Sequence, residues 1–387
     1  MKRRFILLII TLLNLSTTIS ANEGPDYASL LTCGQGEEFY ETFGHSALRI
    51  VDSAKGVDVV FNYGMFSFSE PHFYFKFARG RLNYFVTVQP YQEFMAEYDY
   101  FGRSVTEQRL NMSEEELMRL YKALIINAQP ENKYYRYDIF HDNCATRVHD
   151  MVNAALDESD RIDFKNVNKH VSYRDLIHKY TGKHLKWWCF GCDILLGARC
   201  DRDMTTQQYM YIPAEMMTIY DTSVTMCGQK ISCQPDELLP QTFTPQETVF
   251  SPALFFMLLF LIVLILTLVG KHKGWKLVWL DAVFFAVAAI LSLLLLFMWF
   301  GSDHWCTKWN FNLLWANPLF VYLLFRLRKP CRGMVIATIC CLAAAIVMWF
   351  IGWPQNFNSA TILITLTLIV RLCARLETSG KEKIVAG

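Results

Sequence analysis

The sequence is poor in charge and has no excess of either sign. Only 19% of its 387 residues are charged, and 37 basic against 36 acidic residues leave a net charge of +1. A disordered chain needs many charges and few apolar groups, so the low charge and a hydrophobic content of 53% exclude that class. A nucleic-acid-binding protein carries a basic excess, and the lack of one argues against nucleic acid as a partner.

The chain also lacks internal repeats and low-complexity linkers, and its apolar residues gather in two regions. The first region is the N-terminus, where the basic residues 2–4 precede a short apolar run and then small polar residues. This order is typical of a cleaved secretory signal peptide, with an uncleaved anchor as the alternative. No cysteine follows directly, which argues against a lipoprotein-type anchor. We predict a signal peptide over 1–21 and an extracytoplasmic domain over 22–248.

The second apolar region fills the C-terminal third of the chain. A helix rises about 1.5 Å per residue, so roughly 20 apolar residues match a hydrocarbon core of about 30 Å. The composition changes at Pro252, and we predict a transmembrane domain over 249–375 and a cytoplasmic tail over 376–387. The five predicted spans are 253–270, 277–301, 312–327, 333–352 and 360–372.

Basic residues in the loops set the orientation of these spans. Lysine and arginine gather in 271–276, in 326–332 and after the fifth span, whereas 302–311 and 353–359 together hold one lysine. Basic loops stay in the cytoplasm. The domain before the first span then lies outside, in agreement with the signal peptide. The sequence therefore predicts a multi-pass protein of the bacterial inner membrane with a periplasmic N-terminal domain.

One cysteine of the outer domain has the setting of a nucleophile. Strand-like residues 134–140 lead to Asp142 and Asn143, either of which can cap the helix that starts at Cys144. Unpaired N–H groups and the positive end of the helix dipole favour a thiolate there, and a nucleophilic cysteine needs that lowered pKa. A buried small side chain and half of a disulfide are the alternative interpretations.

A histidine that could serve this cysteine lies upstream. His45 stands where the first of two strands, 46–51 and 57–63, begins, and a turn containing glycine joins these strands. Counting across the hairpin places Asn62 and Tyr63 nearly opposite His45, where one of them could orient the imidazole or donate to an oxyanion. An ordinary edge histidine and ordinary strand packing are the alternatives.

The order of these motifs resembles a known family. An early histidine on a strand and a later cysteine at a helix start are similar to a papain-like fold in permuted order. Residues 42–49 (TFGHSALR), 61–66 (FNYGMF) and 142–147 (DNCATR) resemble the periplasmic domain of the Bacteroides-type lipoprotein N-acyltransferases. Residues 193–197 (DILLG) and 312–318 (NLLWANP) are similar to later parts of that family. The resemblance implies an α+β fold, with a permuted papain-like periplasmic domain before a five-helix transmembrane domain.

The resemblance also implies a thiol acyltransferase. Cys144 would attack the ester carbonyl of a phospholipid, the acyl donor, with His45 as general base and acid, and would hold the acyl group as a thioester. The α-amine of the S-diacylglyceryl cysteine of an apolipoprotein would then take that group. No metal or cofactor is implied, because the ester already holds the energy. A cysteine hydrolase of lipid esters or cell-wall peptides on the same fold and a non-enzymatic membrane protein are the alternatives.

Further cysteines are a departure from that family. Cys189 and Cys192 form a C-x-x-C pair that could be redox-active or bind zinc. We expect structural disulfides instead, because the compartment is oxidising. With Cys144 kept free, the candidates outside the membrane are Cys33, Cys189, Cys192, Cys200, Cys227 and Cys233.

Aromatic residues make up 15% of the chain and are dense between Phe61 and Phe101. Most of these rings are expected in the core of the outer domain. A minority are expected to face the bilayer and to shape a groove for an acyl chain, because the domain is tethered beside the membrane.

Overall fold

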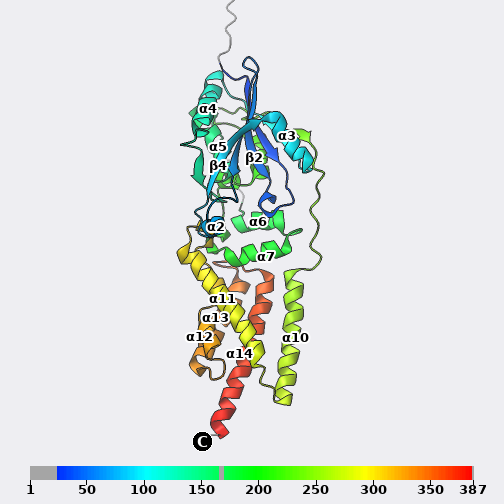
Figure 1. Cartoon of the computed structure of the whole chain (residues 1–387), viewed down its shortest axis with the longest axis vertical. Helices are drawn as coiled ribbons and strands as arrows, with labels where there is room; N and C mark the ends of the chain where they lie inside the picture. Colours follow the sequence, from blue (N-terminus) through cyan, green and yellow to red (C-terminus); the bar gives the residue numbers. More distant parts are fainter. Residues whose placement is uncertain (1–23, 165–169, 386–387) are drawn as a thin grey trace, which may run out of the picture.

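The computed structural model describes residues 24–164 and 170–385, with side chains up to residue 376. The predicted signal peptide at 1–21 lies outside these residues. A domain of strands and helices stands above a bundle of long helices that ends at the C-terminus (Figure 1). The predicted order of an α+β domain and a helical membrane domain is confirmed.

An antiparallel sheet of seven strands forms the centre of the N-terminal domain, in the order β6-β4-β3-β2-β1-β5-β7. Side chains alternate between its two faces, so Leu48 and Phe61 point into one core while Ala47 and Val60 point into another. The strands are β1 (Tyr27–Cys33), β2 (His45–Asp52), β3 (Val57–Met65), β4 (Asn83–Pro90), β5 (Val105–Arg109), β6 (Tyr134–Arg136) and β7 (Asp236–Leu239).

Helices cover both faces of this sheet. The helices α4 (Glu114–Asn127) and α5 (Cys144–Ala155) pack on the face that carries Leu48, and α3 (Tyr91–Tyr100) packs on the other. The remaining helices of this domain are α2 (Phe73–Ala78), α6 (Tyr173–Thr181), α7 (Lys186–Leu195), α8 (Thr206–Tyr209) and α9 (Pro213–Thr222), with short 3₁₀ turns η1 (Phe39–Glu41), η2 (Glu158–Asp160) and η4 (Ala198–Asp201).

Local sequence signals account for the elements around the predicted site. The strands β2 and β3 pair as the predicted hairpin. Ser113 caps α4, and Asn143 caps α5 with its Oδ1 accepting the N–H of Thr146 at 2.9 Å. The predicted strand 134–140 is shorter than expected, because the chain turns back on itself after β6 and Asp138 pairs with Asp142.

Four helices of the described residues are long and apolar enough to cross a membrane. A buried ion pair helps to hold them together, since Asp281 on the second helix pairs with Arg371 on the fourth at 2.6 Å. The four are α10 (Pro252–Lys273), α11 (Val278–Leu296) with its π-helical end η5 (Phe297–Gly301), α13 (Arg332–Ile351) and α14 (Ser359–Val385).

The predicted count of five spanning helices is not confirmed. The expected third span, 312–327, holds only the turn η7 (Phe311–Leu314) and the seven-residue helix α12 (Leu319–Phe325). Seven residues rise about 10 Å, a third of the hydrocarbon core. Pro318 interrupts the segment because it has no N–H to donate, and the side chain of Asn317 accepts the N–H of Leu319 at 3.2 Å.

Amide side chains join the two domains. Asn310, Asn312 and Gln355 donate to backbone carbonyls between Asp193 and Leu196, at 2.7 to 3.1 Å. These carbonyls end α7, where a helix leaves its last acceptors without internal partners. Asn310 and Gln355 come from the two lysine-poor loops of the membrane domain, and Asn312 follows directly after the first of them. Because these loops touch the N-terminal domain, the contact agrees with the predicted orientation of the helices.

Candidate active site

Cys144 is the first residue of α5, as the sequence predicts, and only 8% of it is exposed. Asn143 holds this helix start in place, since its Nδ2 donates to the carbonyls of Ile139 and Tyr211, each at 2.8 Å. Backbone N–H groups, among them that of Ala145, point at the Cys144 sulfur. The nucleophile candidate therefore sits in a fixed position with hydrogen-bond donors around it.

His45 is held by Asn62. Its Nε2 donates to Asn62 Oδ1 at 2.5 Å, and Asn62 is almost fully buried in β3. An amide oxygen can only accept, so the proton of the neutral imidazole stays on Nε2. Nδ1 is then left unprotonated and can accept a proton.

Gly64 brings the histidine and the cysteine together. A Cβ atom placed on Gly64 would lie 3.3 Å from Cys144 Cβ and 3.8 Å from His45 Cε1. The backbone N–H of Ser46, the residue after His45, also reaches the Cys144 sulfur. Both predicted reactive groups thus border one small space that only a glycine leaves open.

Burial governs the charge of this pair. Burial lowers the pKa of His45 to about 4, although the hydrogen bond that His45 donates to Asn62 acts in the opposite direction. The pKa of Cys144 is raised above its usual value by burial, although the nearby N–H groups lower it. The expected low pKa of Cys144 is therefore wrong in sign. At neutral pH the pair is an uncharged thiol beside an uncharged imidazole.

Arg103 belongs to this site but carries no sequence signal. It pairs with Glu41 at 2.6 Å and donates from Nε to the carbonyl of Gly34 at 3.0 Å. Its positive charge lowers the pKa of both His45 and Cys144. Arg103 lies between α3 and β5, outside any motif, and only the fold brings it near the other residues.

Tyr63 is not brought to His45. Its hydroxyl donates to Asn127 Oδ1 at the end of α4, at 2.7 Å, and its ring packs near Tyr135 in the core. Successive residues of a strand point to opposite faces, so Asn62 and Tyr63 cannot both face the imidazole. Of the two candidates on β3, the structure places Asn62 at the histidine.

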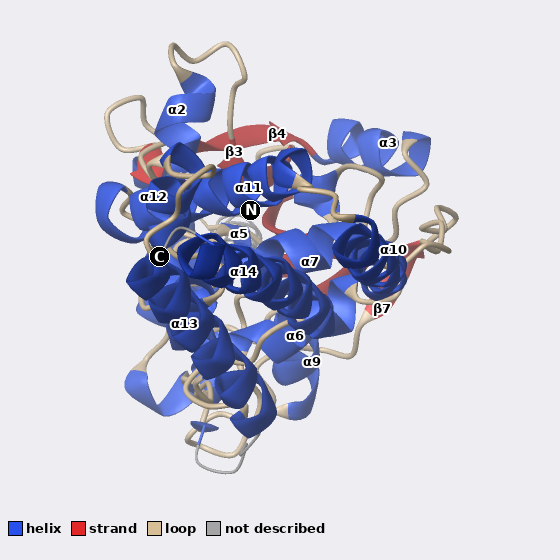
Figure 2. Ribbon diagram, turned by 90° about the horizontal axis from the view of Figure 1, so that it is seen from below, coloured by secondary structure: helices blue, strands red, loops and turns tan. Residues whose placement is uncertain are grey.

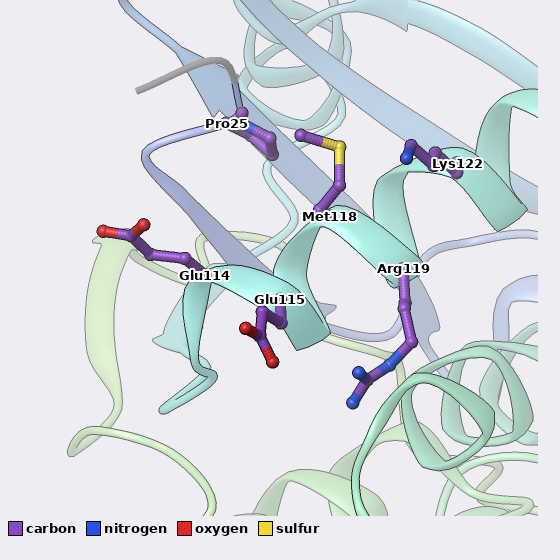
Figure 3. A pocket seen from close by; sticks show the side chains of 7 residues that line it. Pro25, Glu114, Glu115, Met118, Arg119 and Lys122 are labelled. Atoms are coloured by element: carbon purple, nitrogen blue, oxygen red, sulfur yellow. The ribbon is translucent and has the colours of Figure 1, made fainter. Parts of the chain in front are cut away.

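A cavity of about 460 Å³ lies away from this group, beside the start of α4 (Figure 3). None of the predicted site residues lines it. Its lining consists of Gly24, Pro25, Glu114, Glu115, Met118, Arg119 and Lys122.

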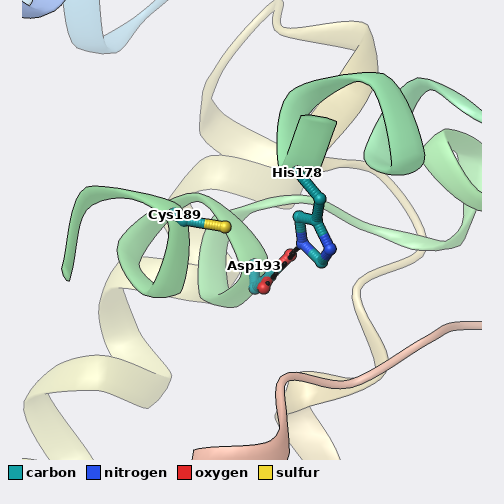
Figure 4. Close-up of side chains that lie close together, drawn as sticks. All are labelled: His178, Cys189 and Asp193. Carbon is teal, nitrogen blue, oxygen red and sulfur yellow. Dashed lines mark hydrogen bonds and ion pairs between the residues drawn. The ribbon is translucent and has the colours of Figure 1, made fainter. Parts of the chain in front are cut away.

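A second cluster of reactive side chains lies at the junction of the domains. Possible ligand atoms of His178, Cys189 and Asp193 lie within 4.8 Å of one another (Figure 4). The buried Asp193 carboxylate already accepts from Arg174, His178 and Asn358, each at 2.8 Å. Its hydrogen bond raises the pKa of His178 to about 10. A metal ion would have to displace these partners, so the cluster acts as a charge network that fixes α6, α7 and the membrane domain.

The expected disulfides are not found, because all twelve cysteines carry free thiols. Cys33 is buried in the sheet, where it interacts with the hydroxyl of Tyr98. Cys189 and Cys192 lie one turn apart on α7. A cysteine that the expected set omits, Cys306 in an outer loop of the membrane domain, lies near Cys192. Burial raises the pKa of Cys192, and the charged form of Cys306 would raise it further.

Two family models match most of the chain. Residues 21–181 match the Lnb N-terminal periplasmic domain, and residues 244–383 match the Lnb transmembrane domain. The chain belongs to the Lnb family. The resemblance to lipoprotein N-acyltransferases is thereby confirmed, and this Lnb family protein is an inner-membrane protein with a periplasmic N-terminal domain. No curated protein and no solved structure matches the chain.

Proposed function

We propose that this Lnb family protein is an apolipoprotein N-acyltransferase that works through a thioester on Cys144. The observation that carries the proposal is the set of His45, Asn62 and Cys144 around Gly64, directly above a membrane domain. A thiol, an imidazole and an amide that orients the imidazole are the groups that cysteine acyl transfer requires. Both substrates are lipids that reach such a site by lateral movement in the outer leaflet.

The first step forms the thioester. His45 Nδ1 takes the thiol proton as the Cys144 sulfur bonds to the ester carbonyl of a phospholipid. Backbone N–H groups at the start of α5 donate to the oxyanion that develops. The carbon–oxygen bond of the ester then breaks, and His45 returns the proton to the departing lysophospholipid. Asn62 accepts from Nε2 throughout and stabilises the transient imidazolium.

The second step forms the amide. The free α-amine of an S-diacylglyceryl cysteine attacks the thioester carbonyl, and His45 takes a proton from the nitrogen. The carbon–sulfur bond breaks, and the sulfur of Cys144 recovers a proton from His45. The lysophospholipid leaves before the apolipoprotein reacts, so the kinetics are ping-pong.

The fate of the acyl group tests this proposal. In vesicles that contain labelled phospholipid, we expect a labelled acyl group on Cys144 that neutral hydroxylamine removes. An added diacylglyceryl-cysteine peptide should then carry the label on its α-amine, as mass spectrometry can show. Release of the label only as free fatty acid would identify a hydrolase instead. Label that never reaches Cys144 would contradict both reactions.

Substitutions identify the residues responsible. Cys144→Ser and His45→Ala should each lower the rate of transfer at least about hundredfold. The serine hydroxyl is a weaker nucleophile than the thiol, and without the His45 base the Cys144 thiol stays protonated. The double variant should be little worse than either, since the two residues act as one unit. Cys227→Ser and His170→Ala, which alter an exposed cysteine and an exposed histidine, should keep the wild-type rate. Full activity of Cys144→Ser would refute the mechanism.

A further inference from the structure

Four large aromatic side chains are exposed in and before α2. The exposed fractions are 58% for Phe68, 78% for Tyr74, 59% for Phe75 and 46% for Phe77. A water-soluble surface seldom gathers so many large rings in ten residues, and such a patch marks an interaction site. We call residues 66–81, which contain these rings, the aromatic segment.

The aromatic segment lies at the level where α11 leaves the membrane. Arg81 pairs with Asp303 at 2.6 Å, and His304 Nε2 donates to the carbonyl of Phe77 at 2.8 Å. Asp303 and His304 lie two and three residues after Gly301, where η5, the π-helical end of α11, stops. Seen from the membrane side, α2 projects beyond the bundle of membrane helices, so no described helix covers it from below (Figure 2). The exposed rings therefore stand outside the helix bundle, at the level of its periplasmic end.

Basic side chains accompany the rings. Lys76 pairs with Glu70 at 2.8 Å, and Arg81 is held by Asp303. Arg79 Nε is buried and has no hydrogen-bond partner among the described residues, while its guanidinium lies over the ring of Phe75. Apolar rings beside basic groups are the composition of segments that lie in a membrane interface, where the phosphates provide acceptors.

A run of rings connects the aromatic segment to the active site. Phe66 follows Gly64, whose position borders Cys144, by two residues. Its ring lies 5.0 Å from that of Phe68 and 5.2 Å from that of Tyr84. Tyr84 stacks on Tyr137 at 4.1 Å. Burial raises the pKa of the Tyr137 hydroxyl most, and Tyr137 lies near enough to Cys144 that a negative charge on that sulfur raises it further. A chain of ring contacts thus links the exposed rings to the neighbourhood of the nucleophile.

We propose that the aromatic segment is inserted into the outer leaflet of the bilayer, and that phospholipid acyl chains pass along it to Cys144. The rings of Tyr74 and Phe75 lie among the acyl chains, and Arg79 binds a lipid phosphate. The position and the composition of the aromatic segment support its insertion. The passage of acyl chains to Cys144 rests on the proposed function, so the two parts need separate experiments.

Photocrosslinking tests the insertion without requiring any catalysis. The full-length protein is placed in vesicles of phosphatidylethanolamine and phosphatidylglycerol, with benzoylphenylalanine replacing Phe75. We expect phospholipid adducts there, and roughly tenfold fewer when the same group replaces Tyr100, because only apolar segments at the interface enter the lipid. Tyr100 is 83% exposed on α3, far from the membrane helices (Figure 1).

Two results would overturn the insertion. Equal adduct formation at positions 75 and 100 would show that the exposure of the side chain alone sets the yield of phospholipid adducts. Adducts at position 75 that require an added diacylglyceryl-cysteine peptide would show that the segment binds the lipid chains of the acceptor and not the bilayer.

A double variant tests the passage of acyl chains. Tyr74→Ser with Phe75→Ser should slow acylation of Cys144 by vesicle phospholipid roughly tenfold and leave acylation by a short-chain, water-soluble thioester unchanged. The matched variant Tyr100→Ser with Phe101→Ser should change neither rate. An equal loss with both donors would overturn the passage, because the variant would then have damaged the site itself. If wild type accepts no acyl group from any donor, the proposed function fails and the crosslinks alone decide the insertion.

Discussion

At the residue scale, burial and hydrogen bonding have opposite effects on the charge of Cys144 and of His45. The N–H groups at the start of α5 favour a thiolate, but the burial of Cys144 outweighs them. Asn62 favours a protonated imidazole, but burial outweighs it at His45 too. A neutral pair has no ionised nucleophile at rest, so the thiol must lose its proton as the new bond forms. Activity then depends on keeping the imidazole neutral.

The pH dependence of thioester formation follows from the pKa of His45. Because that pKa is lowered to about 4, the neutral base persists far into acid. We expect the single-turnover rate with a soluble thioester to stay nearly constant from pH 8 to pH 5 and to fall as pH approaches 4. The unfolded histidine binds a proton already near pH 6.5, so stability also declines below that value. Circular dichroism must therefore confirm folding at each pH. A midpoint near 6.5 would contradict the buried imidazole.

Gly64 offers a matched test of the close approach. Gly64→Ala places a methyl group 3.3 Å from Cys144 Cβ at a φ of +85°, whereas Gly56→Ala has a φ of +64° and no atom within 4 Å. Both variants should lose about 1–2 kcal/mol of stability to the left-handed backbone. Only Gly64→Ala should also lose acylation of Cys144, measured with the hydroxylamine-labile label. Equal activity in the two variants would show that the space at Gly64 is not used.

At the element scale, the sequence predicts what is locally encoded. The caps of α4 and α5 and the turn between β2 and β3 are short-range signals, and these elements form where expected. The hairpin count predicts Asn62 and Tyr63 together near His45, and of the two only Asn62 binds the imidazole. Arg103 depends on tertiary packing and has no such signal. The average hydropathy of 312–327 does not reveal that Asn317 and Pro318 interrupt the helix, so the sequence predicts one continuous third span there.

The charge network at the end of α7 makes a prediction about stability. Asp193→Asn leaves the buried Arg174 with fewer acceptors and removes the carboxylate that stabilises protonated His178. The free energy of unfolding should therefore fall by about 3–5 kcal/mol. Asp203→Asn alters the exposed pair with His170 and should cost under about 1 kcal/mol. Thermal unfolding in detergent measures both changes. Similar losses would show that the network adds nothing beyond a surface pair.

The pH dependence of that stability has a definite sign. The pKa of His178 is raised to about 10, so its contribution is complete below pH 6.5 and is lost as pH rises through about 10. The melting temperature of wild type should therefore fall between pH 8 and pH 10 by more than that of Asp193→Asn. Parallel curves for the two proteins would contradict the ion pair between His178 and Asp193.

At the scale of the whole molecule, the contacts between domains fix which ends of the membrane helices lie outside. Gln355 and Asn312 both bind the end of α7 in the periplasmic domain. The helix α13 ends at Ile351, close to Gln355, and its 20 residues rise about 30 Å. Its start at Arg332 is then on the far side of the membrane. We therefore expect the chain from Asn312 to Arg332 to cross as well, although α12 alone is too short to do so.

Reporter fusions test this crossing. A periplasmic phosphatase is active only outside the cytoplasm, so fusions after Thr244 and within 302–311 should be active and those after Lys276 should be inactive. The fusion after Pro330 shows whether residues 312–327 cross the membrane. We expect this fusion to be inactive, because the basic loop 326–332 stays in the cytoplasm. An active fusion there would mean that 312–327 returns to the outer face. The geometry of α13 would then be wrong, since its two ends could not lie on opposite sides of the bilayer.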